Sequence, residues 1–123
     1  MKLLNKKRRA TGVRPLRTSR ALVAVARAHS EDMMRRGFFG HRSPAFGDLD
    51  RRLASAGLEY SHASENLALS TGPRKAHDSL MSSPSHRKNL LDARLSHVGV
   101  GVAVDPAQGL YYITQCFLSK QEP

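Results

Sequence analysis

The first third of the chain contains a clear helical repeat of apolar side chains. Between Thr18 and Arg36 they recur at steps of three and four residues, as Leu22, Val25, Ala26 and Met33. Thr18 or Ser19 can cap the start of such a helix, and Gly37 can end it. His29 falls on the same face, so we interpret it as a hydrogen-bonded histidine of the core rather than as a ligand.

Shorter helices are predicted on both sides of this one, where capping residues and prolines mark their starts. Their ranges are Leu3 to Ala10, a helix that follows the N-cap Asp48 and ends near Gly57, Arg74 to Ser82 after Pro73, and one or two turns from His86 to Leu91. The segment from Phe38 to Gly47 contains Gly40 and Pro44, which predict a loop.

In the last part of the chain, apolar side chains alternate with small or polar ones, as in a half-buried strand. The alternating apolar positions are Val98, Val100, Val102 and Val104. A turn at residues 105–109 and a return strand from Leu110 to Leu118 predict an antiparallel hairpin at the core of a sheet. Residues 60–69 predict a further strand. Helices first, then a strand, more helix and a closing hairpin indicate an α+β fold.

Three polar residues lie inside apolar segments and are candidates for a functional site: His41, Glu65 and His86. Two imidazoles and a carboxylate can bind a divalent cation or transfer a proton near neutral pH. Their spacing matches no metal motif, so it does not by itself indicate that they meet. Glu65 could equally hold loop amides or a histidine by hydrogen bonds without any turnover. Ser64 and Ser85 stand beside two of these residues, but no nucleophile elbow supports a serine hydrolase.

Several motifs in a fixed order add to this picture. They are Gly12–Leu16 (GVRPL), Ala26–Met33 (ARAHSEDM), Gly37–Pro44 (GFFGHRSP), Ser64–Ala68 (SENLA), Ser82–Leu91 (SSPSHRKNLL) and Val98–Val102 (VGVGV). Over about Leu4 to Phe117 the chain resembles the CAP superfamily, in its bacterial SCP-like branch. The resemblance implies a three-layer α-β-α sandwich with a mostly antiparallel central sheet and a cleft into which the family's histidines and glutamates point.

Residue by residue, the resemblance matches His41 and His86 to the two cleft histidines and Glu65 to the glutamate of the Glu-Asn motif. It implies a divalent cation, zinc or another, on the two imidazoles, with Glu65 bound directly or through water. The same correspondence places four further residues in the cleft lining: Ser64, Asn66, Ser85 and Gln115. Ser83 stands where many members have a second glutamate, and this departure weakens any prediction of a full two-His, two-Glu site.

The net charge of +10 is concentrated at the N-terminus. Residues 1–30 contain nine basic side chains and no acidic one, whereas residues 31–123 are nearly balanced. Such a segment can attract an anionic wall polymer, a membrane surface or nucleic acid without specificity, although a solvated helix face is an equally good interpretation. Specific nucleic-acid binding is not expected, because no aromatic interleaving or recognition motif accompanies the charge.

The length of 123 residues suits one compact domain. The resemblance implies that residues 1–123 are a CAP domain of a longer secreted or cell-envelope protein, and we expect a monomer. Cys116, the single cysteine, is predicted to be buried and unreactive.

Three functions follow, in this order. The first is a binding domain whose cleft holds a cation and a lipid, peptide or glycan ligand. The second is a metal-assisted hydrolase that uses His41, Glu65 and His86. The third is a non-specific binder of nucleic acid or another anionic polymer.

Overall fold

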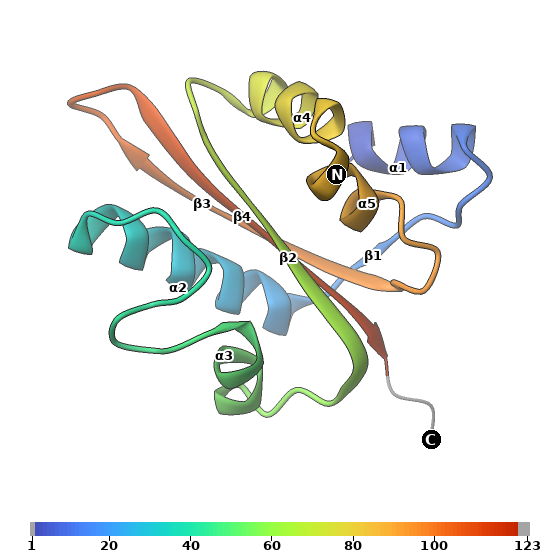
Figure 1. Cartoon of the computed structure of the whole chain (residues 1–123), viewed down its shortest axis with the longest axis horizontal. Coiled ribbons are helices and arrows are strands. Elements are labelled where there is room, and N and C mark those ends of the chain that lie inside the picture. Colours follow the sequence, from blue (N-terminus) through green and yellow to red (C-terminus); the bar gives the residue numbers. More distant parts are fainter. Residues whose placement is uncertain (1, 121–123) are drawn as a thin grey trace.

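The computed structural model describes residues 2–120. The order of elements is α1 (Lys2–Ala10), β1 (Arg17–Thr18), α2 (Arg20–Arg36), α3 (Leu49–Ser55), β2 (Tyr60–Ser70), α4 (Pro73–Ser82), α5 (Pro84–Leu90), β3 (His97–Asp105) and β4 (Leu110–Lys120) (Figure 1). Capping agrees with the sequence signals: Ser19 Oγ accepts from the amide of Leu22, and Gly37 ends α2 with a φ of 70°.

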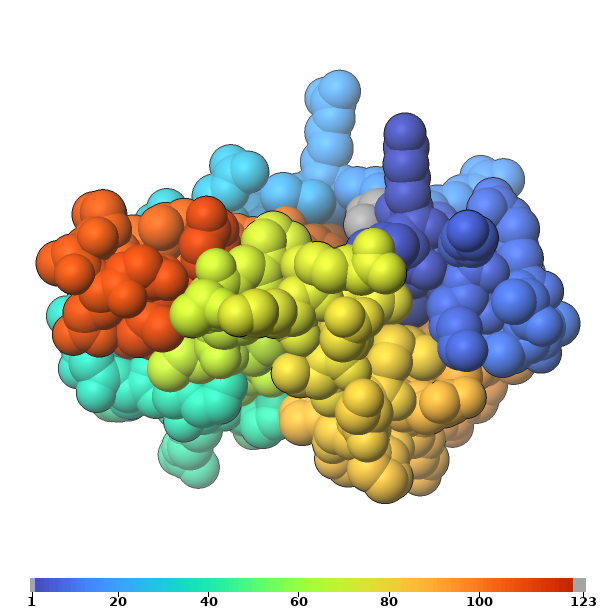
Figure 2. Space-filling model, turned by 90° about the horizontal axis from the view of Figure 1, so that it is seen from above, coloured from blue at the N-terminus to red at the C-terminus, as the bar shows by residue number. Residues whose placement is uncertain are grey.

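The helices cover the two faces of one sheet, which confirms the α-β-α sandwich. On one face α1, α4 and α5 enclose a core that includes Leu4, Leu80, Leu90 and Phe117. On the other face α2 and α3 enclose a second core that includes Leu22, Ala26, Leu53 and Cys116. Figure 2 looks onto the first of these faces, where α1 lies beside α4 and α5.

The strands are ordered β1-β3-β4-β2. The predicted hairpin is confirmed, because β3 and β4 pair antiparallel in the centre of the sheet, with Val98 opposite Phe117. β2 pairs antiparallel with β4 and forms an edge. The sheet is mixed rather than purely antiparallel, since β1 pairs in parallel with β3, Arg17 opposite His97.

Two glycines of β3 allow α2 to pack directly on the sheet. A Cβ atom at Gly99 would lie 2.2 Å from a backbone carbon of Leu22, and one at Gly101 would lie 2.1 Å from the amide nitrogen of Arg27. The residues that alternate with the valines are therefore small because a helix backbone occupies the space of their side chains.

Two local expectations differ from the structure. The helix predicted from His86 begins two residues earlier, at Pro84, because proline at the first helical position needs no amide partner and Ser83 serves as the cap of both α4 and α5. The two-residue strand β1 is absent from the predicted elements, since so short a strand depends on a partner about 80 positions away.

The interpretation of the basic N-terminal segment as a solvated patch is wrong for Arg8. This side chain is fully buried. Its guanidinium donates to the carbonyl oxygens of Arg14 (2.8 Å), Leu90 (2.7 Å), Asp92 (3.3 Å) and Leu95 (3.4 Å). Arg8 therefore ties α1 to the segment between α5 and β3.

Candidate functional site

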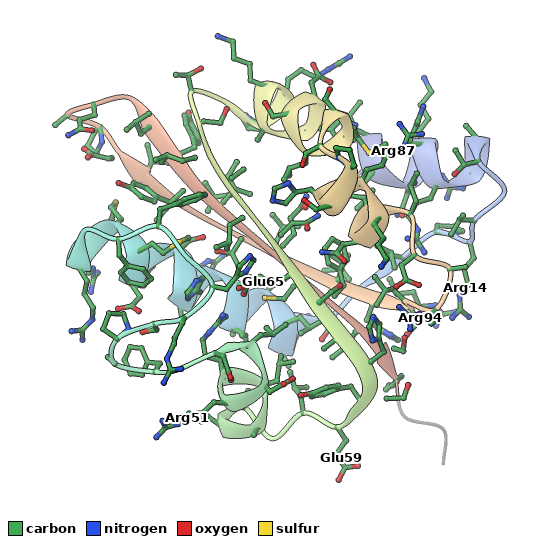
Figure 3. All side chains as sticks on the ribbon, viewed as in Figure 1. Arg14, Arg51, Glu59, Glu65, Arg87 and Arg94 are labelled. Atoms are coloured by element: carbon green, nitrogen blue, oxygen red, sulfur yellow. The ribbon has the colours of Figure 1, made fainter. Side chains whose placement is uncertain are left out.

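Glu65 of β2 is at the centre of the candidate site. Its side chain is only 2% exposed and faces α3. Arg52 of α3 donates to both carboxylate oxygens, from Nη1 to Oε2 at 2.7 Å and from Nη2 to Oε1 at 2.9 Å. This two-pronged pairing matches the planar guanidinium to the carboxylate and fixes the position of Glu65. Figure 3 shows Glu65 beside β2, while Arg51, the neighbour of Arg52, points away from the domain.

His41 lies on the loop between α2 and α3 and contacts the same carboxylate. Its Nδ1 is 2.9 Å from Oε1 of Glu65, and its side chain is 59% exposed. Because an ionised carboxylate can only accept, Nδ1 carries the proton in this pair. The second ring nitrogen, Nε2, is therefore the atom that His41 can offer to a ligand.

Buried polar side chains fix the His41 loop at several points. Arg52 Nη2 donates to the carbonyl of His41 at 2.7 Å, and His29 Nε2 donates to the carbonyl of Gly40 at 2.8 Å. Further along the loop, Ser43 Oγ donates to Asp32 at 2.5 Å. The backbone that carries the imidazole of His41 is therefore fixed by these hydrogen bonds without a ligand. The prediction for His29 is confirmed, since it is buried in the core and bonded to the backbone.

His86 is positioned from the opposite side of β2. Successive side chains of a strand point to opposite faces, so Asn66 faces α5 while Glu65 faces α3. Asn66 Nδ2 donates to the carbonyl of His86 at 3.1 Å, and the Nδ1 of His86 is 2.8 Å from Ser83 Oγ. The structure therefore pairs His41 with Glu65 directly and connects His86 to the same edge strand through Asn66.

The remaining predicted cleft residues take different positions around this strand. Gln115 of β4 accepts from Asn66 Nδ2 at 3.3 Å, on the α5 side. Ser85 is exposed near the start of α5, 3.4 Å from Ser83 through the two hydroxyls. The hydroxyl of Ser64 is buried and has no hydrogen-bond partner within residues 2–120. Asn66 and Gln115 therefore support the position of α5.

Sequence comparison adds to this geometry. A family model described as CAP, the cysteine-rich secretory protein family, matches residues 1–117. The chain belongs to the CAP family. The uncharacterized protein YkwD of Bacillus subtilis is 36% identical over 102 residues, which are 82% of this chain and 40% of YkwD. The uncharacterized membrane protein YlbC of the same organism is 34% identical over 111 residues, which are 89% of this chain and 30% of YlbC. This CAP chain thus spans less than half the length of both relatives.

Solved structures support the same family and fold. An extracellular protein containing a SCP domain from Bacillus anthracis has a TM-score of 0.87 and 32% identity over 96% of this chain and 38% of its own. An outer surface protein of Borrelia burgdorferi has a TM-score of 0.89 at 16% identity, covering 98% of this chain and 89% of its own, which supports the fold alone. Within residues 2–120, no helix of this CAP chain has the length and apolar composition to cross a membrane.

The charge state of Glu65 in this CAP domain follows from its neighbours. Burial by itself raises the pKa of the carboxyl, but the hydrogen bonds from His41 and Arg52 and the charge of Arg52 outweigh it, so the pKa is lowered. Burial and the nearby Arg52 also lower the pKa of His29. Glu65 is thus an anion and His29 a neutral imidazole at neutral pH.

The donor set of this CAP domain fits a metal ion only in part. Both oxygens of Glu65 accept hydrogen bonds from Arg52. The positive charge of Arg52 would repel a metal ion bound directly to Glu65. In the described chain, no three His, Cys, Asp or Glu side chains form a group able to hold a metal ion. His41 keeps a feature of metal-binding histidines, a second-shell carboxylate on its Nδ1.

The residue that the sequence analysis missed is Arg52. Leu49, Arg52 and Leu53 lie at the three- and four-residue steps of one helix face, and Leu53 is fully buried. An arginine on an apolar helix face requires a buried partner, which is a signal that the sequence contained. Asn89 was missed as well; its Nδ2 donates to Asn66 Oδ1 at 2.8 Å.

Cys116 is fully buried, as predicted, and its thiol lies 3.6 Å from Glu65 Oε2. Burial and the negative charge of Glu65 both raise the pKa of this thiol. We expect a thiol reagent to modify native protein at least ~1,000-fold more slowly than unfolded protein, because reaction requires the core to open. Absorbance assays with and without denaturant measure this ratio. Similar rates in the two states would contradict the burial of Cys116.

Proposed function

We propose that this CAP domain is a binding domain of an extracellular or cell-envelope protein and that its ligand contacts the exposed imidazole of His41. The proposed location is supported by the similarity to an extracellular protein containing a SCP domain from Bacillus anthracis. The proposed ligand is a lipid, a peptide or a glycan. A metal-assisted hydrolase with His41, Glu65 and His86 is the alternative.

The observation that carries this proposal is the pairing of Glu65 with Arg52. A general base needs a lone pair directed at the substrate or at water, and a pKa near the working pH. In Glu65 both oxygens accept hydrogen bonds from Arg52, and the pKa of the carboxyl is lowered. Such a carboxylate is a weak base and a poor nucleophile, so it is better suited to orient His41 than to activate water.

The arrangement gives His41 a defined role in binding. Glu65 fixes the ring through Nδ1, and Arg52 fixes the backbone of the same residue through its carbonyl. A residue whose ring and backbone are both held by hydrogen bonds loses little conformational entropy when a ligand binds. Nε2 then accepts a hydrogen bond from a hydroxyl or amide donor, or coordinates a cation.

A panel of ester, peptide and glycan substrates, assayed with and without zinc, tests the choice between binding and hydrolysis. We expect no turnover above that of heat-denatured protein. Turnover that disappears in the His41→Ala variant while the variant remains folded would overturn the binding proposal in favour of the hydrolase.

Cation binding is the second candidate function, favoured by the way both imidazoles are held. His41 and His86 each have Nδ1 engaged, by Glu65 and by Ser83 respectively, which leaves the Nε2 atoms as the candidate ligands. Zinc bound there would supply a Lewis acid or a fixed positive charge for an anionic ligand group. Glu65 acts only through His41.

We expect zinc affinity to fall at least ~10-fold in His41→Ala and to decline as the pH drops, because imidazoles coordinate only when neutral. His97→Ala is the matched control, since His97 lies at the start of β3. Calorimetry at pH 7.5 and pH 5.5 measures both effects. Equal zinc affinity of wild type and His41→Ala would exclude His41 as a ligand.

A further inference from the structure

A second concave region lies at the end of the sheet where β1 and β3 begin and β4 ends. It is an open pocket of about 970 Å³. Its lining includes Arg14, Arg17, His62, Arg94, His97 and Lys120. Figure 3 shows Arg14 and Arg94 near each other at this end of the domain. None of the residues of the His41 site lines it.

Among residues 2–120, the lining of this basic-end pocket has four cationic side chains, Arg14, Arg17, Arg94 and Lys120, and no acidic one. The carboxylate of Asp92 contacts two of the lining residues: it accepts from Arg94 at 2.8 and 3.1 Å and lies 3.4 Å from His62. Asp92 offsets the charge of Arg94 and holds its guanidinium in place. Within residues 2–120, the other three cations form no ion pair with a carboxylate.

Neighbouring groups show that positive charge is concentrated here. Burial lowers the pKa of His97, and the charges of Lys120, Arg17 and Arg14 lower it further. His97 Nδ1 is bonded to Ser96 Oγ at 2.8 Å, so its ring is oriented at the pocket wall. The hydroxyls of Ser61, Ser96 and Ser119 add short polar groups to the same lining.

We propose that this pocket binds a soluble anion that carries two or more adjacent phosphate groups. Guanidinium groups match phosphate oxygens in pairs, and serine hydroxyls complete such contacts. The volume is at the upper end of the range for ligand sites, larger than a single phosphate needs. The cations lie on β1 and the link before it, on the segment before β3 and on β4. From these separate positions they can contact several phosphates at once.

A membrane surface fits this pocket less well than a soluble anion. Membrane-binding surfaces combine basic residues with exposed apolar side chains that enter the interface. The large apolar side chains exposed among residues 2–120 are Leu3, Phe39, Phe46, Leu69, Val102 and Val104. None of these six lines the pocket. The cations therefore surround a hollow without a large exposed apolar side chain among residues 2–120 to enter the interface.

Titration with inorganic tripolyphosphate at low salt tests the proposal. The test protein combines Arg14→Gln, Arg17→Gln and Lys120→Gln, all exposed positions. Arg94 is left unchanged because its loss would remove the hydrogen-bond donor of the Asp92 carboxylate. The matched control combines Lys6→Gln, Arg27→Gln and Arg35→Gln, three exposed cations outside the pocket, with the same change in net charge.

We expect the pocket variant to lose about 10- to 100-fold in affinity, roughly the effect of one hydrogen bond between charged groups, because solvent and salt weaken the contacts of exposed side chains, and the control to lose less than about 3-fold. In wild type, tripolyphosphate should raise the pKa of His97, followed by NMR of its ring protons. Equal losses in the two variants would mean that net charge alone attracts the anion. That result would overturn the proposal, as would an unchanged His97 titration or no binding by wild type. Unchanged binding by His41→Ala would separate this pocket from the His41 site.

Discussion

Replacing Arg52 by methionine is expected to lower the free energy of unfolding by about 3–5 kcal/mol. The substitution keeps the length of the apolar stem but leaves Glu65 as a buried carboxylate with His41 as its main remaining donor. It also leaves the carbonyl of His41 without the hydrogen bond from Nη2. Chemical denaturation of wild type and variant measures the difference. Arg51→Met is the control, because Arg51 is exposed and its loss should change stability by less than about 0.5 kcal/mol.

The cost of Arg52→Met should depend on pH. The folded-state pKa of Glu65 is lowered, so its ion pairing stabilises the protein above the unfolded value of ~4.3, and this contribution is lost as the pH falls through the lower folded value. The difference between wild type and variant should therefore be largest near neutral pH and shrink below about pH 4. A difference that stays constant down to pH 3 would mean that packing, not the ion pair, accounts for the loss.

Replacing Arg8 by methionine is expected to cost about 3 kcal/mol or more. The guanidinium is fully buried and donates to carbonyls of four residues, and hydrogen bonds from a charged donor contribute about 1.5–3 kcal/mol each before the lost burial cost of the charge is deducted. The amides of α1 should also exchange faster with solvent, because Arg8 connects α1 to the segment before β3.

The control for this substitution is the adjacent residue. Arg9 is exposed, so Arg9→Met removes the same charge from the same helix and should change stability by less than about 0.5 kcal/mol. Equal effects of the two substitutions would contradict the structural role of Arg8. Calorimetric melting of the two variants measures them side by side.

The local elements were predictable because their signals are local. Ser19 and Gly37 bound α2 through hydrogen bonds to residues three and four positions away: the Ser19 side chain accepts from the Leu22 amide, and the Gly37 amide donates to the Met33 carbonyl. The β3–β4 hairpin follows from alternating valines and a short turn. The pairing of β1 with β3 could not be predicted, because two residues contain no periodicity and the partner strand lies about 80 positions away.

The candidate site was predictable only in outline. The motifs identified His41 and Glu65, and the structure brings these two into contact. The third member of that contact, Arg52, reads in the sequence as one of two adjacent arginines on a short helix. Whether an arginine is buried depends on the packing of the helix and on the availability of a carboxylate opposite it, and both depend on residues far away in the chain.

The sequence alone determined the family, the α+β class, the limits of α2 and the excess of positive charge at the N-terminus. Only the tertiary structure decided what the charged side chains do. Burial and pairing depend on three-dimensional distance: Arg8 became a fully buried support for α1, Arg52 became the partner of Glu65, and Arg14 came to share a pocket with Lys120. Charge interactions weaken with the distance between the charges in space, and that distance cannot be derived from their positions along the chain.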